Sequence, residues 1–387
     1  MSAVAIKGWC PGALRPMPSG DGLVVRIRPR GGRLDAAQAA GIADLAGRYG
    51  NGLIDLTSRA NLQIRGVTDQ SFPPLSDGLA LLGLLDPDER TEARRNILVT
   101  PFWADGDDTA PLAAELELGL ANFPFDLPTK FGFAIDDGRE RVLAGNSADI
   151  RIERDRDGKL LVRADGARRG RSVTRSEAVQ VALALAEWFV ASDGDNGERK
   201  RMAASLAAGT HQPKSLQGDA EPAPQAADPV PGLCALGAIV GVAFGQLPYR
   251  TLSHLAASAQ ALRVTPWRML LAEGLREMPR DADLITRADD PALRVVACSG
   301  APRCGEAFAD TRALASRLAP LIPQDARLHV SGCGKGCAHA GPADITLVAT
   351  REGFELIRGG STRDAPAMRG LTAAGLIADP AALAGGR

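Results

Sequence analysis

The 387-residue chain has no segment that could cross a membrane, because no stretch reaches the roughly 18 apolar residues that a spanning helix needs. Its first residues, MSAVAIKGWCPG, contain no apolar run of the kind found in secretory signal peptides. The net charge is only −1, which indicates neither a nucleic-acid-binding surface nor a basic membrane patch. These absences predict a cytoplasmic protein with no nucleic-acid partner and no membrane partner.

Nucleotide-binding motifs are also missing. No G-x-G-x-x-G motif follows a predicted strand, and there is no P-loop, so no Rossmann-type nucleotide site is expected. Electrons for any redox reaction should therefore come from a separate donor protein or another reductant. Lysine is scarce, since six of the 45 basic residues are lysine and the other 39 are arginine. Arginine pairs with carboxylates through two hydrogen bonds, which suits a polyanionic organic ligand, although a GC-rich genome would give the same bias.

Four of the six cysteines lie within 40 residues, as the pairs Cys298-x5-Cys304 and Cys333-x3-Cys337 in the glycine-rich runs CSGAPRC and CGKGC. Thiolates presented in pairs from two loops are the ligand set of a cubane iron–sulfur cluster. The first spacing is too wide for a structural zinc site, and disulfides are not expected in a cytoplasmic protein. The sequence therefore predicts a 4Fe-4S cluster held by these four cysteines. Cys10 and Cys234 have no second cysteine at a comparable spacing and suit small buried residues. A role in the site stays open for Cys10.

The chain repeats itself. A strand (22–29), a helix that begins after Asp35 and a strand pair (53–57 and 61–67) are followed later by the same order of elements. Thr57, Leu62 and Gly66 align without a gap with their counterparts, Thr265, Leu270 and Gly274. Each copy continues into a further strand and a helix, at 95–101 with 109–123 and at 294–300 with 305–322. We infer an internal duplication of α+β halves in which only the second copy carries the clustered cysteines.

This duplicated frame, with C-x5-C and C-x3-C in its second copy, resembles the sulfite and nitrite reductase superfamily over essentially the whole chain. The segments GLIDLTSRANLQIRGV (52–67), RRNILVTP (94–101) and LPTKFGF (127–133) are similar to its tetrapyrrole-contacting and anion-contacting segments. The runs KGWCPGALRPMPSGDGLVVRIRP (7–29) and HVSGCGKGCAHAGPAD (329–344) resemble one branch, the precorrin-3B synthase family of aerobic cobalamin biosynthesis.

The resemblance implies an α+β nitrite/sulfite reductase-like fold with two ferredoxin-like halves, each followed by an α/β domain. We expect the first half at 1–75, its α/β domain at 76–209, and a Pro/Ala-rich linker at 210–232. The second half should span 233–285, and the second α/β domain, with the cluster, should span 286–387.

Three departures separate this chain from the reductases. They present Asn-Gly-Cys where this chain has Lys335-Gly336-Cys337, Arg-Gln where it has Arg59-Ala60, and a second lysine where it has Gly132. Loss of cations that handle sulfite argues against that chemistry. The resemblance instead implies a monooxygenase that uses dioxygen to hydroxylate the tetrapyrrole precorrin-3A at C20 and closes a γ-lactone. A sirohaem-dependent sulfite or nitrite reductase is the alternative, and a cluster protein that only transfers electrons or binds a tetrapyrrole is a third.

The resemblance also suggests roles for individual residues. Arg59, Arg95 and Lys130 are expected to bind substrate carboxylates. Lys335, between two cluster ligands, would offset cluster charge or reach a substrate carboxylate. His339, two residues after Cys337, is a candidate ligand for the mononuclear non-haem iron that the resemblance implies, or alternatively a hydrogen-bond donor to the cluster.

Overall fold

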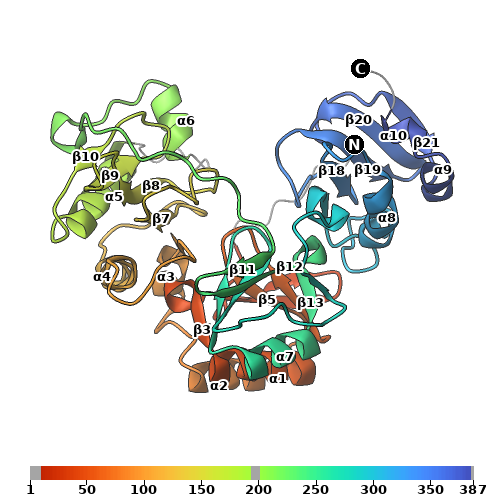
Figure 1. Ribbon diagram of the computed structural model, residues 1–387, viewed down its shortest axis with the longest axis horizontal. Helices are drawn as coiled ribbons and strands as arrows, with labels where there is room; N and C mark the ends of the chain where they lie inside the picture. Colours follow the sequence, from red (N-terminus) through yellow and green to blue (C-terminus); the bar gives the residue numbers. More distant parts are fainter. Residues whose placement is uncertain (1–9, 193–200, 385–387) are drawn as a thin grey trace.

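The computed structural model describes residues 10–192 and 201–384. Two α/β lobes stand on a central unit, which is built from both ferredoxin-like halves (Figure 1). The N-terminal lobe contains β6–β10, and the C-terminal lobe contains β17–β21. Within the described residues, no helix is long and apolar enough to cross a membrane.

The central unit contains two antiparallel sheets that exchange one strand each. In the first sheet the order is β1-β2-β5-β4-β13, and in the second it is β11-β12-β15-β14-β3, with β16 paired to β12. Strand β13 therefore comes from the second half of the chain and β3 from the first. The bounds are Met17–Ser19 (β1), Gly22–Ile27 (β2), Arg33–Asp35 (β3), Leu53–Leu56 (β4), Leu62–Val67 (β5), Gly232–Cys234 (β11), Gly237–Val242 (β12), Gln246–Pro248 (β13), Ala261–Val264 (β14), Met269–Glu273 (β15) and Leu284–Ile285 (β16).

Helices α1 (Ala36–Tyr49), α2 (Phe72–Leu81) and α7 (Tyr249–Ser258) cover these sheets on the side opposite the two lobes (Figure 1). Helix α1 begins after Asp35, as predicted. The Asp35 carboxylate accepts a hydrogen bond from the Gln38 amide at 2.7 Å, and the Gln38 side chain accepts one from the Asp35 amide. This capping box satisfies two amides that the helix itself cannot. The buried face of α1 packs into the central core.

The duplication is visible in a pair of equivalent turns. The Thr57 hydroxyl accepts hydrogen bonds from the amides of Arg59 and Asn61, and the Thr265 hydroxyl accepts them from Trp267 and Met269. One residue in each turn is left-handed, with φ of 52° at Ala60 and 61° at Arg268. Arg59 therefore occupies the position that Trp267 takes in the second copy.

The two α/β lobes share one topology. Their sheets run in the orders β10-β9-β8-β7-β6 and β17-β18-β19-β20-β21. In each sheet the first three strands along the chain are parallel to one another, and the last two are added in antiparallel pairs. The strands are Ile97–Val99 (β6), Phe133–Asp136 (β7), Ile150–Arg154 (β8), Leu160–Ala164 (β9), Arg171–Ser172 (β10), Val295–Ala297 (β17), Leu328–Ser331 (β18), Ala343–Thr350 (β19), Gly353–Gly360 (β20) and Met368–Leu371 (β21). The remaining helices are Glu89–Arg94 (α3), Thr109–Ala121 (α4), Ala178–Ser192 (α5), Met202–Ala207 (α6), Thr311–Leu318 (α8), Ala373–Ala378 (α9) and Ala381–Ala384 (α10). The α+β, internally duplicated architecture is confirmed.

Three details differ from or refine the sequence analysis. The helix expected over 305–322 is shorter, because the chain from Cys304 to Phe308 turns instead, and α8 begins only after Asp310 caps it. The segment 210–232 forms isolated bridges to residues 141, 155 and 170 of the N-terminal lobe. The boundary we expect after residue 75 lies inside α2, whose buried face belongs to the central core.

A buried carboxyl group in the N-terminal lobe gives a pH-dependent prediction. Asp136, at the end of β7, is 2% exposed; its Oδ2 accepts a hydrogen bond from the Leu143 amide, while Oδ1 has no partner within the described residues. Burial, with a smaller contribution from Glu153, raises its pKa to about 6. Between pH 4 and 6 the folded protein holds a proton that the unfolded chain has released, so stability falls as pH rises through this window.

The variant Asp136→Asn resembles the protonated group at every pH. At pH 8 we expect it to be more stable than the wild type by up to about 3 kcal/mol, with the gain shrinking toward pH 4. Denaturant unfolding at several pH values measures this, and Asp44→Asn, on an exposed site of α1, is the control. A gain that does not depend on pH would show that Asp136 is ionised in the folded protein.

Candidate functional site

The four clustered cysteines meet at one edge of the C-terminal sheet. Cys298 and Cys304 follow β17, whereas Cys333 and Cys337 follow β18, its parallel neighbour. Loops that leave the same ends of adjacent parallel strands lie together, and the four thiols are close enough to influence one another. Burial raises the pKa of the Cys337 thiol, and the charges of the other three raise it further. The pKa of Cys333 is raised in the same way by burial, Cys304 and Cys298.

Backbone amides point at these sulfur atoms. The Gly332 amide donates to Cys298 Sγ at 3.1 Å, and the Lys335 amide lies close enough to Cys333 to act against the rise of its pKa. Thr311 fixes the first loop by donating to the Cys298 carbonyl at 2.7 Å. Amide donors to the sulfurs are typical of iron–sulfur sites, where they stabilise the negative cluster. The donor set and its surroundings fit a 4Fe-4S cluster.

The described residues form no site for a single metal ion. Within the residues described, no three His, Cys, Asp or Glu side chains converge as one ion would require. A cubane distributes its four thiolates over four irons, so the cysteines need not converge on one point. Two imidazoles do lie together, because the rings of His329 and His339 meet edge to face with centroids 5.7 Å apart.

These histidines differ in their surroundings. His329, on β18, is fully buried, and neither ring nitrogen has a hydrogen-bond partner within the described chain. Burial, followed by the charges of His339 and Arg268, lowers its pKa to about 4, so it is neutral at physiological pH. His339 Nε2 lies 3.1 Å from the Pro342 carbonyl oxygen, and the ring lines a cavity beside the cluster loops.

A cavity in three adjoining compartments lies next to the cysteines. The arginine compartment, of about 400 Å³, is lined by Cys10, Gly12, Arg15, Arg26, Arg28, Arg59, Glu89, Arg90, Glu92, Ala93, Asn96, Leu127, Pro128, Thr129 and Lys130. The cluster compartment, of about 260 Å³, shares Arg26 with it and includes Cys298, Cys337, Asp55, Arg268 and Arg312. The aromatic compartment, of about 500 Å³, shares Phe244 and Arg268 with the cluster compartment and adds Trp267 and His339.

Two of the three predicted carboxylate-binding residues come together in the arginine compartment. Arg59 Nη1 donates to the Lys130 carbonyl at 3.1 Å, and both side chains line the cavity. Among the described residues Arg59 has no carboxylate within ion-pair distance. Burial, followed by the nearby charge of Arg201, lowers the pKa of Arg59. A cation held this way can pair with an incoming anion.

Arg95 lies elsewhere. Its side chain is 5% exposed and makes a two-pronged contact with Asp86, with Nε–Oδ1 and Nη2–Oδ2 both at 2.9 Å. Its Nη1 donates to the Arg28 carbonyl, and Glu117 is 3.7 Å away. Arg95 does not line the arginine compartment, and the structure gives it the contacts of a buried structural ion pair.

Lys335 is also paired, since its Nζ lies 3.5 Å from Glu306 Oε2. Its charge lowers the pKa of Cys333 and Cys337, although burial and the neighbouring thiolates dominate both shifts. Lys335 therefore lies beside Cys333 and Cys337, and Glu306 compensates part of its charge.

Three further arginines line the cavity without having been predicted from the sequence: Arg26, Arg268 and Arg312. Burial first, and then the charge of a neighbouring arginine, lowers the pKa of Arg26 and of Arg268 to about 10. Arg26 Nε and Arg312 Nε and Nη1 are buried without a hydrogen-bond partner in the described chain. Buried cations with unused donors suit an anionic ligand. The alternation of GLVVRIRP could have pointed to Arg26, but nothing local distinguishes Arg312.

Residues between Cys10 and Arg15 line the arginine compartment. The amides of Ala13 and Leu14 donate to the Glu92 carboxylate, which also accepts from Arg28 Nη1 at 2.7 Å. A Cβ at Gly12 would lie 2.3 Å from Glu92 Oε2, so a side chain there would displace the Glu92 carboxylate. This arrangement holds Cys10, which we expected to be a buried apolar residue, against the Arg26 side chain in the arginine compartment.

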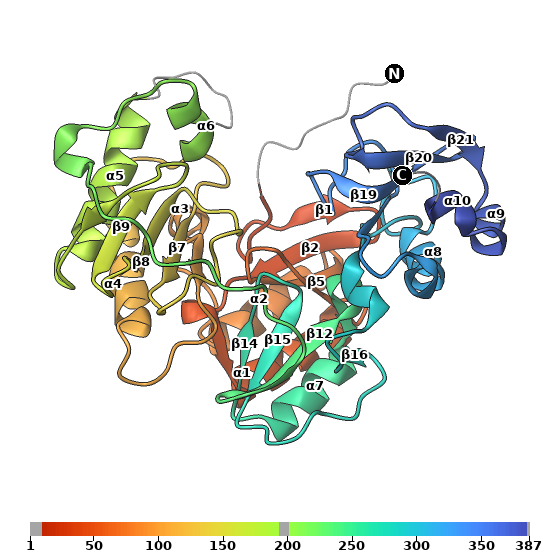
Figure 2. The same ribbon diagram turned by 45° about the horizontal axis from the view of Figure 1, so that its top comes forward.

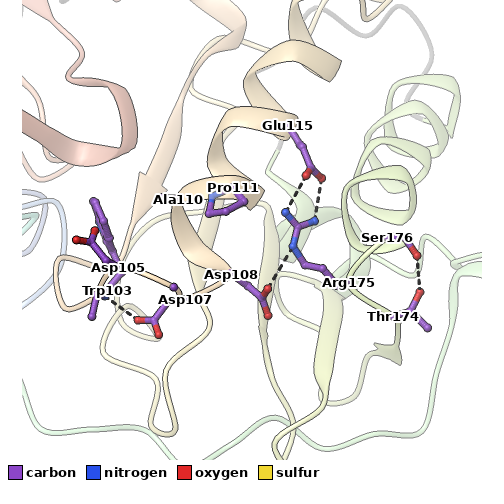
Figure 3. Close-up of a pocket in the computed structure, with 12 residues that line it drawn as sticks. Trp103, Asp105, Asp107, Asp108, Ala110, Pro111, Glu115, Thr174, Arg175 and Ser176 are labelled. Carbon is purple, nitrogen blue, oxygen red and sulfur yellow. Dashed lines mark hydrogen bonds and ion pairs between the residues drawn. The ribbon is translucent and has the colours of Figure 1, made fainter.

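A further concavity, of about 840 Å³, lies between α4 and the turn before α5 (Figure 3). Its charges are largely paired with one another, since Arg175 contacts both Glu115 and Asp108. It contains no cysteine and none of the predicted site residues. The arginine, cluster and aromatic compartments are therefore the candidate site.

Comparisons with known proteins agree with this geometry. Residues 15–82 match the nitrite/sulfite reductase ferredoxin-like half domain. The chain is 30% identical to a precorrin-3B synthase from Sinorhizobium sp, over 93% of this chain and 84% of that one. It is 26% identical to a ferredoxin–nitrite reductase from Synechococcus elongatus, over 89% and 81%. The solved structure of the Mycobacterium tuberculosis NirA protein, at 19% identity, has the same fold with a TM-score of 0.64 and covers 88% of this chain and 74% of its own.

Proposed function

Because the chain belongs to the precorrin-3B synthase family within the nitrite and sulfite reductase superfamily, we propose that it hydroxylates precorrin-3A at C20 with dioxygen and closes a γ-lactone. The observation that carries this proposal is the cavity lined both by cluster cysteines and by arginines whose charge is not fully neutralised. A tetrapyrrole with carboxylate side chains supplies the negative charge that such a site lacks.

Cys298, Cys304, Cys333 and Cys337 would hold the 4Fe-4S cluster, which supplies electrons one at a time when bound. Hydroxylation of a carbon atom consumes one dioxygen molecule, two electrons and two protons. One oxygen atom enters the product, and the second leaves as water. An external donor protein or reductant must provide the electrons. Lys335, next to Cys333 and Cys337, would offset part of the negative charge as electrons arrive, the rest of its own charge being paired with Glu306.

The mononuclear iron implied for this family has no complete ligand set within the described residues. His339 and His329 are the pair of imidazoles nearest the cavity, which supports His339 as one candidate ligand. Its alternative, donating a hydrogen bond toward the cluster, fits less well in this conformation because Nε2 faces the Pro342 carbonyl.

The decisive test of the proposal is the source of the new oxygen. Anaerobically purified holoprotein is incubated with precorrin-3A and a reductant under ¹⁸O-labelled dioxygen, and the product is examined by mass spectrometry. We expect one labelled oxygen atom in the hydroxyl group and no product without dioxygen. Label that enters only from ¹⁸O-water, or product formed anaerobically, would exclude the monooxygenase.

A sirohaem-dependent reductase is the second candidate, since nitrite reductases are among the relatives. Sirohaem has strong absorption bands in the red region that an iron–sulfur cluster lacks. The spectrum of the purified protein therefore separates the two functions before any assay.

Arg59 provides a test of substrate binding. A charge-assisted contact contributes about 1.5–3 kcal/mol, so we expect Arg59→Ala to weaken precorrin-3A binding by roughly ten- to a hundredfold. Its melting temperature should change little, because no carboxylate within the described chain depends on it. The matched control is Arg48→Ala, an exposed arginine on α1 paired with Asp44. Unchanged affinity in Arg59→Ala would remove this residue from the substrate site.

A further inference from the structure

Four non-glycine residues of the described chain have a left-handed backbone: Ala60, Lys130, Phe244 and Arg268. Three of them line the candidate site, Lys130 in the arginine compartment and Phe244 and Arg268 in the other two. This conformation is unfavourable for any residue with a side chain, and most of all for a bulky one. Such residues persist where the surrounding structure fixes them, and they cluster at active sites and ligand-binding sites.

The duplication supplies an internal comparison for Phe244. The pair Phe244–Gly245 follows β12 with φ of 55° and 71°, and the pair Gly31–Gly32 follows β2 with φ of 58° and 70°. In both copies this turn leads directly into the exchanged strand, β13 or β3. The same backbone is therefore built with glycine in one copy and with phenylalanine in the other.

Glycine at position 31 is not required by lack of space. A Cβ added to Gly31 would meet no atom within 4 Å, so its backbone freedom alone accounts for it. By the same argument glycine would suit position 244. An aromatic ring kept there against the backbone preference indicates that the ring itself is needed.

The position of the ring suggests what it contacts. Phe244 is half-buried and lines both the cluster and the aromatic compartments, which it shares with Arg268 and Ala338. Arg268 packs against the next residue, since its Cδ lies 3.0 Å from the place of a Cβ on Gly245. Trp267 lines the aromatic compartment from the duplicated turn. Aromatic side chains among buried arginines suit a ligand that has an apolar ring system and a charged rim.

We propose that the Phe244 ring is a ligand-contacting residue that packs against the apolar ring system of the tetrapyrrole beside the cysteines, while the arginines bind its carboxylates. This inference rests on the proposed function, because it takes precorrin-3A as the ligand. The competing explanation is packing, since one side of Phe244 also contacts the core of the C-terminal lobe.

Three variants separate these roles. Phe244→Leu keeps an apolar side chain for the core, Phe244→Ala removes the ring and keeps the backbone strain, and Phe244→Gly removes both. The control Gly31→Ala introduces the same strain at the duplicated turn, away from the cavity. The holoproteins are titrated anaerobically with precorrin-3A and, separately, with uroporphyrin, a polycarboxylate tetrapyrrole, and their melting temperatures are measured.

We expect all three Phe244 variants to bind both tetrapyrroles at least about tenfold more weakly, because an aromatic contact is lost. Phe244→Gly should melt above Phe244→Ala, and Gly31→Ala should melt below the wild type with unchanged affinity. Wild-type affinity in Phe244→Leu and Phe244→Ala, with lower melting temperatures, would show that the ring serves packing only. If the wild type binds precorrin-3A without converting it in oxygen, the proposed reaction fails while the affinities still decide the role of Phe244. If the wild type binds neither tetrapyrrole, both proposals are wrong.

Discussion

Replacing Cys333 with alanine should abolish the iron–sulfur cluster, with loss of its broad visible absorbance and of iron and sulfide from the purified protein. The physical reason is that each iron of a cubane requires a thiolate, and the loop that supplies Cys333 also supplies Cys337. Binding of metal and folding of a small site are coupled, so loss of one ligand destabilises both loops. The amide that now points at Cys333 would lose its acceptor as well. Iron and acid-labile sulfide analysis after anaerobic purification measures the effect.

The chain offers a matched control in Cys234. This cysteine ends β11 and packs against a small apolar cluster far from the two loops in sequence. Cys234→Ala should keep the full iron and sulfide content and the visible spectrum. Full cluster content in Cys333→Ala, or cluster loss in Cys234→Ala, would show that the ligand assignment is wrong.

We expect Arg95→Ala to lower the free energy of unfolding by about 3–5 kcal/mol more than Arg59→Ala does. Removing Arg95 leaves Asp86, which is 6% exposed, without its two-pronged partner. Arg30 remains 3.3 Å from Asp86 but is itself half-exposed and shared with Glu117, so it compensates only in part. Breaking one side of a buried ion pair is costly because the other charge stays buried.

Denaturant unfolding, compared with precorrin-3A titration, checks this difference between the two arginines. Arg287→Ala is the control, since Arg287 also pairs with an aspartate, Asp289, but at the surface, where such pairs add little stability. If Arg95→Ala is as stable as the wild type and instead loses affinity for precorrin-3A, Arg95 reaches the substrate in the bound state and our original expectation of a carboxylate-binding role was right.

Tetrapyrrole binding should be most sensitive to the arginines that the sequence did not single out. Arg26 and Arg312 come from opposite ends of the chain, one on β2 and the other in the first turn of α8, and both retain unused buried donors. Figure 2 shows why they meet: the β1–β2 hairpin lies alongside the C-terminal lobe, and Ser19 in β1 contacts the Arg303 carbonyl of the cluster loop. The first half of the chain therefore contributes one wall of a site whose clustered cysteines belong to the second.

The sequence alone determined the features that depend on near neighbours. Four cysteines in two short loops predicted a cluster because its ligand set is local, and Asp35 predicted the start of α1 because an N-cap acts within one helical turn. The duplication could be recognised because equivalent turns repeat the same spacing of Thr57, Gly66 and their counterparts. The opening and cluster-loop runs together identified the family.

Only the tertiary structure decided the rest. Strand exchange through β3 and β13 pairs residues more than 190 positions apart, and no periodicity in either half encodes that choice of partner. Whether an arginine is free to bind a ligand depends on which carboxylate lies next to it in space. Arg95 forms an ion pair with Asp86, which compensates its charge. Arg59, Arg26 and Arg268 line a cavity and have no carboxylate within ion-pair distance among the described residues. These residues are chemically identical in the sequence, and long-range folding alone separates an arginine paired with a carboxylate from one that lines a cavity.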